Sequence, residues 1–325
     1  MRIGKVPEAV LKRSVLKQIG HRREELVTGA GVGGDFAAVK ALEGEVLVLS
    51  GNPAMLGDIG YYSVLNAVND IAASGSEPIG VLLCILLPDG TGEADLKQIV
   101  RRAEETCKEL NIQIMGGHTE VSRAVNRPVI TATGIGRVRS GELVSPGGAR
   151  PGDDVVITKW IGLEGSAVIA AEKERELTEH FNPSFVRDAM SFSGLVSVKG
   201  DSEAIRGFEI HSMHNASQGG IFGALWELAA SAKAGLCIEL KEIPVRQETI
   251  EIAEFYGINP YELNSGGAML ITAPCGHDVV KALKAAGINA AVAGRITEGR
   301  DRVVKNGDDI RFLEPPVSDE LYKIL

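Results

Sequence analysis

The sequence predicts a two-domain protein of the α/β or α+β class. Its 325 residues correspond to roughly two domains at about 150 residues each. In both halves of the chain, short apolar runs typical of buried strands alternate with amphipathic segments typical of helices. Between the halves, residues 145–153 are rich in proline and glycine, which indicates a boundary. We therefore expect domains at residues 1–147 and 148–325, without the regular alternation of a doubly wound parallel sheet.

The first half is expected to mix helices and strands. An amphipathic helix over residues 7–26 begins after Pro7 and is followed by a glycine-rich loop at residues 29–34. The later elements are recognised from apolar runs bounded by glycine, proline and aspartate. They are strand 45–50, helix 56–74, strand 79–87, helix 93–110, strand 112–115 and strand 129–138.

The second half repeats this mixture with a different order of elements. Its strands are short apolar runs, and its helices carry polar residues on one side. The expected elements are strand 154–158, helix 166–173, a helix that follows Gly219 and Gly220 and runs to about Ala232, strand 236–240, helix 248–256, strand 269–273, helix 277–286 and strand 290–295.

Composition excludes several classes of protein. The 34 basic and 43 acidic residues give a net charge of −9, which disfavours nucleic-acid binding by bulk electrostatics. The longest apolar run, residues 81–87, is too short to span a bilayer, and no signal peptide is visible after Met1. The 4 cysteines form no C-x-x-C pair, which is typical of free thiols in a reducing compartment. We expect a cytoplasmic protein that binds neither nucleic acid nor membrane.

The glycine-rich loop is the first candidate site. Gly29, Gly31 and Gly34 have the spacing of a dinucleotide-binding fingerprint, but the loop follows an expected helix and opens none, so we reject that interpretation. Backbone amides at Gly31, Gly33 and Gly34 could instead wrap a phosphate group. A plain surface loop is the alternative.

Three polar residues share one face of the helix at residues 56–74. Asn66, Asn69 and Asp70 are spaced by three and four residues. Oxygen ligands of this kind suit a hard cation that also binds phosphate oxygens. A hydrated helix face or a capping network is the alternative.

Two further motifs could contact a ligand. Gly117, His118 and Glu120 follow the strand at 112–115, where His118 could transfer a proton or contact phosphate and Glu120 could help to hold a metal. A structural turn is equally consistent with these residues. The stretch 215–220, Asn-Ala-Ser-Gln-Gly-Gly, opens a helix whose exposed amides suit an anionic group. His211 and His214 lack further ligands nearby, which argues against zinc.

Taken together, these motifs resemble the ATP-dependent superfamily of aminoimidazole ribonucleotide (AIR) synthetase (PurM), thiamine-monophosphate kinase, selenophosphate synthetase and HypE. The resemblance is greatest to the HypE-like, AIR synthase-related branch. Six pieces occur in family order between residues 29 and about 295. They are Gly34-Asp-Phe-Ala-Ala-Val39, Asn69-Asp-Ile-Ala-Ala-Ser-Gly-Ser-Glu-Pro78, Gly116-Gly-His-Thr-Glu120, Thr133-Gly-Ile-Gly136, Pro151-Gly-Asp-Asp-Val-Val-Ile-Thr158 and His214-Asn-Ala-Ser-Gln-Gly-Gly220.

The resemblance implies a PurM-like fold. Its N-terminal mixed sheet would pair with that of a second subunit into a barrel-like dimer, and its C-terminal domain would be α+β. ATP would bind near the dimer interface, and the chemistry would be magnesium-dependent transfer of a phosphoryl group to a small substrate. In the HypE branch, ATP phosphorylates a carboxamide oxygen and loss of phosphate gives a nitrile.

The resemblance also assigns roles to residues of this chain. The catalytic candidates are Asp35, Asp70 and His118, and the magnesium candidates are Asp35, Asp70 and Glu120. The candidates for contacts with ATP or the acceptor are Gly31, Gly33, Gly34, Asn66, Asn69, Gly117, Glu120, Asn215 and Ser217.

Departures from the family pattern favour a second hypothesis. Asn52 stands where relatives commonly have an acid, and Asn215 and Ser217 replace an Asp and a Thr. HypE ends in a cysteine that carries the carbamoyl group, whereas this chain has none after Cys275. Cyanation cannot run here in its usual form. The alternative is a catalytically weakened maturation or scaffold protein that acts with a partner protein.

Overall fold

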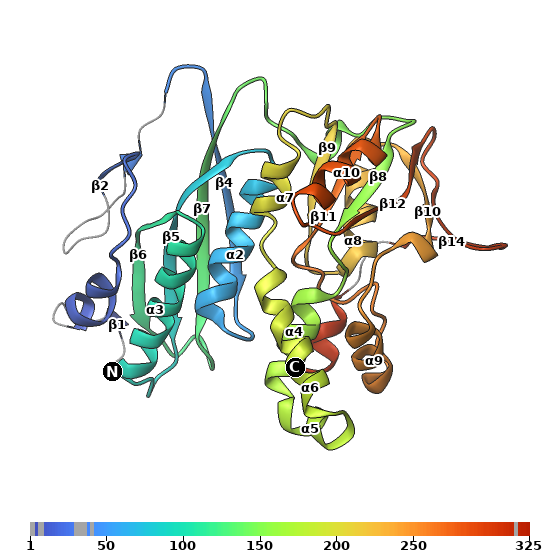
Figure 1. The fold of residues 1–325 in the computed structure, drawn as a ribbon. Helices are drawn as coiled ribbons and strands as arrows, with labels where there is room; N and C mark the ends of the chain where they lie inside the picture. Colours follow the sequence, from blue (N-terminus) through green and yellow to red (C-terminus); the bar gives the residue numbers. More distant parts are fainter. Residues whose placement is uncertain (1–3, 6–9, 29–37, 40–41, 315–317) are drawn as a thin grey trace. The chain divides into compact units, whose positions relative to one another are not determined.

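The computed structural model describes residues 4–5, 10–28, 38–39, 42–314 and 318–325. The chain divides into two compact units (Figure 1). Unit 1 contains residues 1–72 and 76–143, and unit 2 contains residues 73–75 and 144–325. The functions predicted for domains 1–147 and 148–325 stay predictions.

Unit 1 is built on a five-stranded mixed sheet. Its strand order is β1-β6-β5-β7-β4, in which β5 and β6 are parallel and the other neighbours are antiparallel. The strands are β1 (Gly4–Lys5), β4 (Glu45–Ala54), β5 (Glu77–Leu87), β6 (Gln113–Val121) and β7 (Val129–Arg139). The predicted strand 112–115 is therefore too short, because β6 continues through both glycines to Val121.

Two helices cover one face of this sheet. Helices α2 (Ile59–Ala72) and α3 (Glu93–Glu109) lie against it in Figure 1 and confirm the two helices predicted here. Side chains such as Val64 and Val68 of α2 pack with Leu83 and Ala132 of the sheet in one buried core. Glycines 134 and 136 of β7 allow this contact, because a Cβ on either would meet α2 at 3 Å or less. The other face, called the open face below, carries exposed side chains.

The predicted helix at residues 7–26 is confirmed over residues 10–18 only as short helical turns, and it is wrong from residue 19 onward. Short turns η1 (Leu11–Val15) and η2 (Leu16–Gln18) are followed by irregular chain and by strand β2 (Leu26–Thr28). The N–H groups of Gly20 and His21 donate to the Glu104 carboxylate at 2.8 and 2.6 Å. These tertiary hydrogen bonds replace the helical ones that the apolar periodicity predicted.

The glycine-rich loop lies between two paired strands. Strand β2 pairs antiparallel with β3 (Ala38–Val39). Residues 29–37, between these strands, lie outside the described residues, and they include Gly31, Gly33, Gly34 and Asp35.

Unit 2 is built on a seven-stranded sheet of order β14-β13-β10-β12-β8-β11-β9. Only β10 and β13 are parallel neighbours. The strands are β8 (Asp154–Thr158), β9 (Ser212–Ala216), β10 (Gly235–Glu239), β11 (Ala268–Ala273), β12 (Ala290–Thr297), β13 (Arg302–Asn306) and β14 (Asp309–Phe312). The first strand of the unit, β8, is thus enclosed by β11 and β12, which come much later in the chain.

Helices complete unit 2, and several of them were not predicted. They are η3 (Pro146–Gly148), α4 (Leu163–Glu172), α5 (Glu174–His180), α6 (Pro183–Ser191), η4 (Phe192–Leu195), α7 (Lys199–Ala204), α8 (Gly220–Ala232), η5 (Leu240–Glu242), α9 (Gln247–Tyr256), α10 (Gly276–Ala285) and η6 (Glu320–Lys323). Helix α8 packs its apolar side on the sheet through Leu225 and Leu228. Helices α5 to α7 and strands β9, β13 and β14 were missing from the prediction. The α+β class itself is confirmed.

Candidate functional site

Asp70, near the end of α2, faces two side chains of β4. The Ser50 hydroxyl donates to Asp70 Oδ2 at 2.6 Å, and Asn52 Nδ2 donates to the same oxygen at 2.5 Å. All three residues are half-buried. Asn66 shares this helix face and is half-buried as well, whereas Asn69 is fully buried. The structure therefore joins Asp70 to Asn52, the residue that departs from the family pattern.

This contact changes what the site can hold. In relatives with an acid at position 52, a cation could lie between that acid and the equivalent of Asp70. Here the Asn52 amide donates to Asp70 and places its own partial positive charge at that position. The described oxygen set around Asp70 carries a single negative charge, which is weak for Mg²⁺ without further acids. Asp35, the second predicted acid, lies outside the described residues.

His118 and Glu120 lie together on β6. Their side chains are two residues apart on one strand, and His118 Nε2 is 3.1 Å from Glu120 Oε2. Both are well exposed, at 46% and 39% of the side-chain surface. A ligand can therefore reach this pair of side chains from solvent.

The sheet separates this pair from Asp70 within one chain. His118 is paired with Cys84 of β5, which is exposed on the open face. Asn52 is opposite the buried Ala132 of β7, on the face covered by α2. Because successive side chains of a strand alternate between the faces of a sheet, His118 and Asp70 belong to opposite faces. Across the described part of the chain, no three His, Cys, Asp or Glu side chains converge on a possible metal position.

Gly117 has a structural reason to be glycine. Its φ is 144°, and a Cβ there would lie 1.9 Å from the carbonyl oxygen of Leu83 on β5. The bare backbone thus serves strand pairing. Its predicted contact with ATP stays a prediction.

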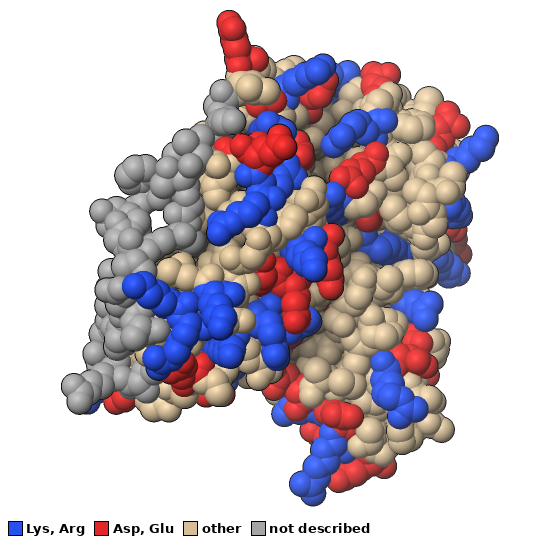
Figure 2. All heavy atoms as spheres, turned by 60° about the vertical axis from the view of Figure 1, so that its left-hand side comes forward, with Lys and Arg blue, Asp and Glu red and all other residues tan. Residues whose placement is uncertain are grey.

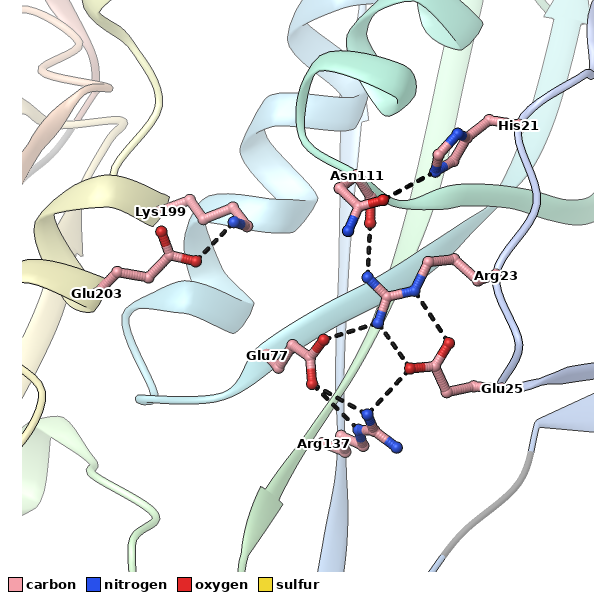
Figure 3. Close-up of polar contacts among 8 residues, drawn as sticks. All are labelled: His21, Arg23, Glu25, Glu77, Asn111, Arg137, Lys199 and Glu203. Atoms are coloured by element: carbon pink, nitrogen blue, oxygen red, sulfur yellow. Dashed lines mark hydrogen bonds and ion pairs between the residues drawn. The ribbon is translucent and has the colours of Figure 1, made fainter.

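An ion-pair network next to β2 joins residues that were not among the predicted site residues. Figure 3 shows Arg23 and Arg137 joined to Glu25 and Glu77. Arg23 donates to Glu25 at 2.7 and 2.9 Å, and this bond lowers the pKa of Glu25 to about 2. Glu25 immediately precedes β2, so the network ties the start of this strand to β5 and β7 of the sheet.

The second-unit motif at residues 215–220 also opens a helix, as predicted. Asn215 is buried on β9, Ser217 is half-buried beyond it, and α8 begins at Gly220. The amide of Gly219, which was predicted to be exposed, donates instead to Asp319 Oδ2 at 2.7 Å. Asn264 and Leu321 donate backbone N–H groups to the other oxygen of Asp319 at 3.2 and 2.9 Å.

Asp319 therefore holds the C-terminal segment on the predicted anion site. Its side chain is buried, and burial raises the pKa of Asp319 although three N–H groups favour the ionised form. Gln218 adds a contact to the Tyr322 hydroxyl at 3.1 Å. An anion at the start of α8 would have to replace the chain's own carboxylate.

The two histidines of the excluded zinc motif have separate partners. His211 Nδ1 lies 2.8 Å from Asp153, and His214 Nε2 lies 3.0 Å from Glu227. Neither pair shares a residue with the other.

Figure 2 shows Lys and Arg side chains intermingled with Asp and Glu on the face that it draws. Within the described ranges, no helix has the length and apolar character needed to cross a membrane.

Comparison with protein families gives two matches in chain order. The N-terminal domain of AIR synthase related proteins matches residues 33–138, and the C-terminal domain of the same family matches residues 150–306. Together the matches cover most of the chain. They confirm the resemblance that the motifs indicated.

Curated relatives point to the HypE branch. A putative hydrogenase expression/formation protein of Methanocaldococcus jannaschii is 26% identical, over 99% of this chain and 97% of that protein. Carbamoyl dehydratase HypE of Rhizobium leguminosarum is 31% identical, over 74% of this chain and 68% of that protein.

Solved structures share the fold. HypE in complex with ATP superposes with a TM-score of 0.81 at 20% identity, and the match covers 96% of this chain and 95% of that one. A HypE–HypF complex gives a TM-score of 0.69 at 24% identity, over 85% of this chain and 92% of that one. At these identities the likeness establishes the fold alone.

Proposed function

The chain belongs to the AIR synthase related family, and on that premise we propose that it is an ATP-using enzyme of the HypE type. The proposed reaction transfers the γ-phosphoryl group of ATP to an oxygen of a small carbonyl, amide or phosphate substrate. The acceptor oxygen forms the new bond to phosphorus, and ADP leaves with the electrons of the broken P–O bond. The family match over both halves of the chain carries the proposal.

The residues proposed to bind ATP lie mainly in unit 1. Phosphoryl transfer needs positioning and charge neutralisation more than covalent help from the protein. Backbone amides of Gly31, Gly33 and Gly34 would bind the phosphates, and the Arg23–Glu25 network would fix the start of their loop. Asn66 would contact the nucleotide from α2, whereas the fully buried Asn69 would reach it only after neighbouring side chains move.

Magnesium is proposed as the cofactor, with Asp35 and Asp70 as its carboxylate ligands. When bound, it would neutralise phosphate charge. Asn52 can take part only after its amide turns to present oxygen instead of N–H to the cation. This rearrangement predicts weaker magnesium affinity than a site with an acid at position 52.

A homodimer through the open face is the second part of the proposal. Leu47 and Leu49 of β4 are 38% and 65% exposed there, so two large apolar side chains of the sheet are left in water. His118 and Glu120 lie on the same face, so their proposed roles depend on this dimer. Light scattering on Leu49→Lys should give the mass of one chain where the native protein gives two. A native protein with the mass of one chain would exclude the dimer.

A catalytically weakened maturation protein is the alternative function. The Asn52–Asp70 bond and the Asp319 carboxylate at the start of α8 favour it, because both place the chain's own groups where ligands are expected. Asn215 and Ser217 would still face an acceptor or partner group. The HypE–HypF complex among the structural neighbours supports a protein partner for this chain too.

Thermal stability with nucleotide tests the proposal. ATP with Mg²⁺ at 100 times its Kd should stabilise the native protein by about 2.7 kcal/mol and raise the Tm by several degrees. Asp70→Ala should lose most of this shift, whereas Asp188→Ala, a change at an exposed acid of α6, should keep it. No shift with any nucleotide would contradict ATP binding, and binding without ADP release would favour the alternative.

A further inference from the structure

Unit 2 carries a group of aromatic rings at the contact of three helices. Helices α5, α6 and α9 pack against one another and lie together in Figure 1. Phe181 stacks on Phe185 with ring centres 4.7 Å apart, and Phe255 meets Phe181 edge to face at 5.7 Å. His180 and Tyr256 extend the group, with ring centres 4.6 and 4.8 Å from Phe255. We call these five residues the aromatic patch.

The rings of the patch are an outer layer and not the core of this helical region. Leu177, Val186 and Ile252 of the same helices are at most 1% exposed and fill the interior. The three Phe side chains and Tyr256 are half-buried, and His180 is exposed. Three of the chain's 8 phenylalanines thus gather where part of each ring remains in contact with water.

Acidic side chains surround the patch. The three helices carry seven acidic residues against two arginines, and α9 has acids only. Glu174 and Glu254 are exposed, and no described basic group pairs with either of them. Glu176 approaches Tyr256, whose pKa is raised to about 12 by burial and by this carboxylate. Arg175 lies 3.7 Å from Glu179 and Arg246 lies 3.5 Å from Glu248, so these two acids are compensated, whereas the charges of Glu174 and Glu254 are not compensated by a described basic group.

We propose that the aromatic patch and its acidic rim form a docking surface for an arginine-bearing segment of a partner protein. Ring faces attract a guanidinium through their quadrupole, and a planar guanidinium also stacks on them. The surrounding carboxylates raise the local concentration of a basic partner and hold its charges in register. Aromatic and arginine side chains are the residues that contribute most at protein interfaces.

The same charges exclude other occupants. Nucleic acids and anionic membranes are repelled by an acidic rim. A second copy of this chain would meet the patch with equal negative charge. The surface lies entirely in unit 2 and uses no residue of the proposed ATP chemistry, so it can be tested without nucleotide.

The experiment uses the full chain and labelled hexa-arginine, hexa-lysine and hexa-glutamate peptides in a fluorescence anisotropy titration. Hexa-arginine should bind best, hexa-lysine more weakly and hexa-glutamate not at all. Binding should weaken as NaCl rises from 50 to 300 mM, because exposed charges are screened over about 10 Å or less. Equal affinity for the two basic peptides would overturn the role of the rings.

Two variants and a control locate the binding. Phe181→Leu with Phe255→Leu keeps apolar volume but removes π faces, and should weaken hexa-arginine binding about threefold or more while leaving hexa-lysine nearly unchanged. Glu174→Gln with Glu254→Gln should weaken both peptides about fivefold. The matched control, Glu298→Gln with Asp308→Asn, removes two exposed charges elsewhere in unit 2. If it weakens binding as much as the patch variants, the attraction is non-specific and the proposal fails.

Discussion

The contact between Asn52 and Asp70 can be tested by restoring the acid that relatives commonly carry. Asn52→Asp replaces a side-chain amide whose nitrogen lies 2.5 Å from Asp70 Oδ2 with a second carboxylate. A hydrogen bond to a charged group contributes about 1.5–3 kcal/mol, and this is lost. Two like charges about 4 Å apart repel by about 1–4 kcal/mol between bulk water and an effective dielectric of about 20. After rotation of one side chain, we expect a net cost of about 2–4 kcal/mol.

The assay is thermal unfolding of Asn52→Asp in EDTA and in Mg²⁺. At pH 7 in EDTA its Tm should fall by about 4–16 °C, at roughly 2–4 °C per kcal/mol for units of this size. Below about pH 5 the loss should shrink, because two adjacent carboxylates then share a proton. Millimolar Mg²⁺ should restore more Tm in the variant than in the native protein, because it binds between two acids.

Asn126→Asp is the control, since Asn126 is exposed and lies in a turn of unit 1. It adds the same charge and should change the Tm by less than about 2 °C. If Asn52→Asp unfolds like the native protein in EDTA at pH 7, the contact with Asp70 is absent. If it is destabilised but indifferent to Mg²⁺, the contact stands and the proposed cation position is refuted.

Three further changes test the fold around the site. Glu25→Gln should lower the free energy of unfolding by about 1 kcal/mol at pH 7. Arg23 lowers the pKa of Glu25 to about 2, so the stabilisation by the Glu25 carboxylate is complete above about pH 4.5 and is lost as the pH falls through about 2. A stability difference that persists unchanged at pH 2 would contradict this. Gly117→Ala should cost about 1–3 kcal/mol in urea unfolding, because its Cβ meets a carbonyl of β5; an unchanged midpoint would refute the close approach. Asp201→Asn should cost about 3–5 kcal/mol, since Lys159 Nζ lies 2.6 Å from Asp201 in a buried pair, and adding Lys159→Met should recover part of the loss.

The parts predicted well from sequence have strong local signals. Strand β5 is an apolar run closed by proline and glycine, and α3 has a clear apolar stripe bounded by Gly92 and Asn111. Helix α5 was missed because Leu177 is its one buried residue, so no periodicity marks it. Strand β6 was cut short because Gly116 and Gly117 look like a turn until the close approach to β5 is known.

The single residues of the candidate site could be predicted from the sequence, but their positions relative to one another could not. Asp70, His118 and Glu120 were recognised from their motifs, but only strand register shows that the sheet lies between them. The partners Glu25 and Arg137 are 112 positions apart, so no local pattern connects them. Likewise, nothing in the sequence near Gly219 indicates that the carboxylate of Asp319, 100 positions later, accepts a hydrogen bond from its N–H group.

The position of β8 inside the second sheet affects how the chain matures on the ribosome. Strand β8 leaves the exit tunnel early, yet its neighbours β11 and β12 begin only at Ala268 and Ala290. At about 5–20 residues per second, synthesis leaves both of its edges bare for on the order of ten seconds. A nascent chain stalled in that interval displays an apolar strand with unsatisfied backbone groups, which is a template for aggregation and a natural target for chaperones.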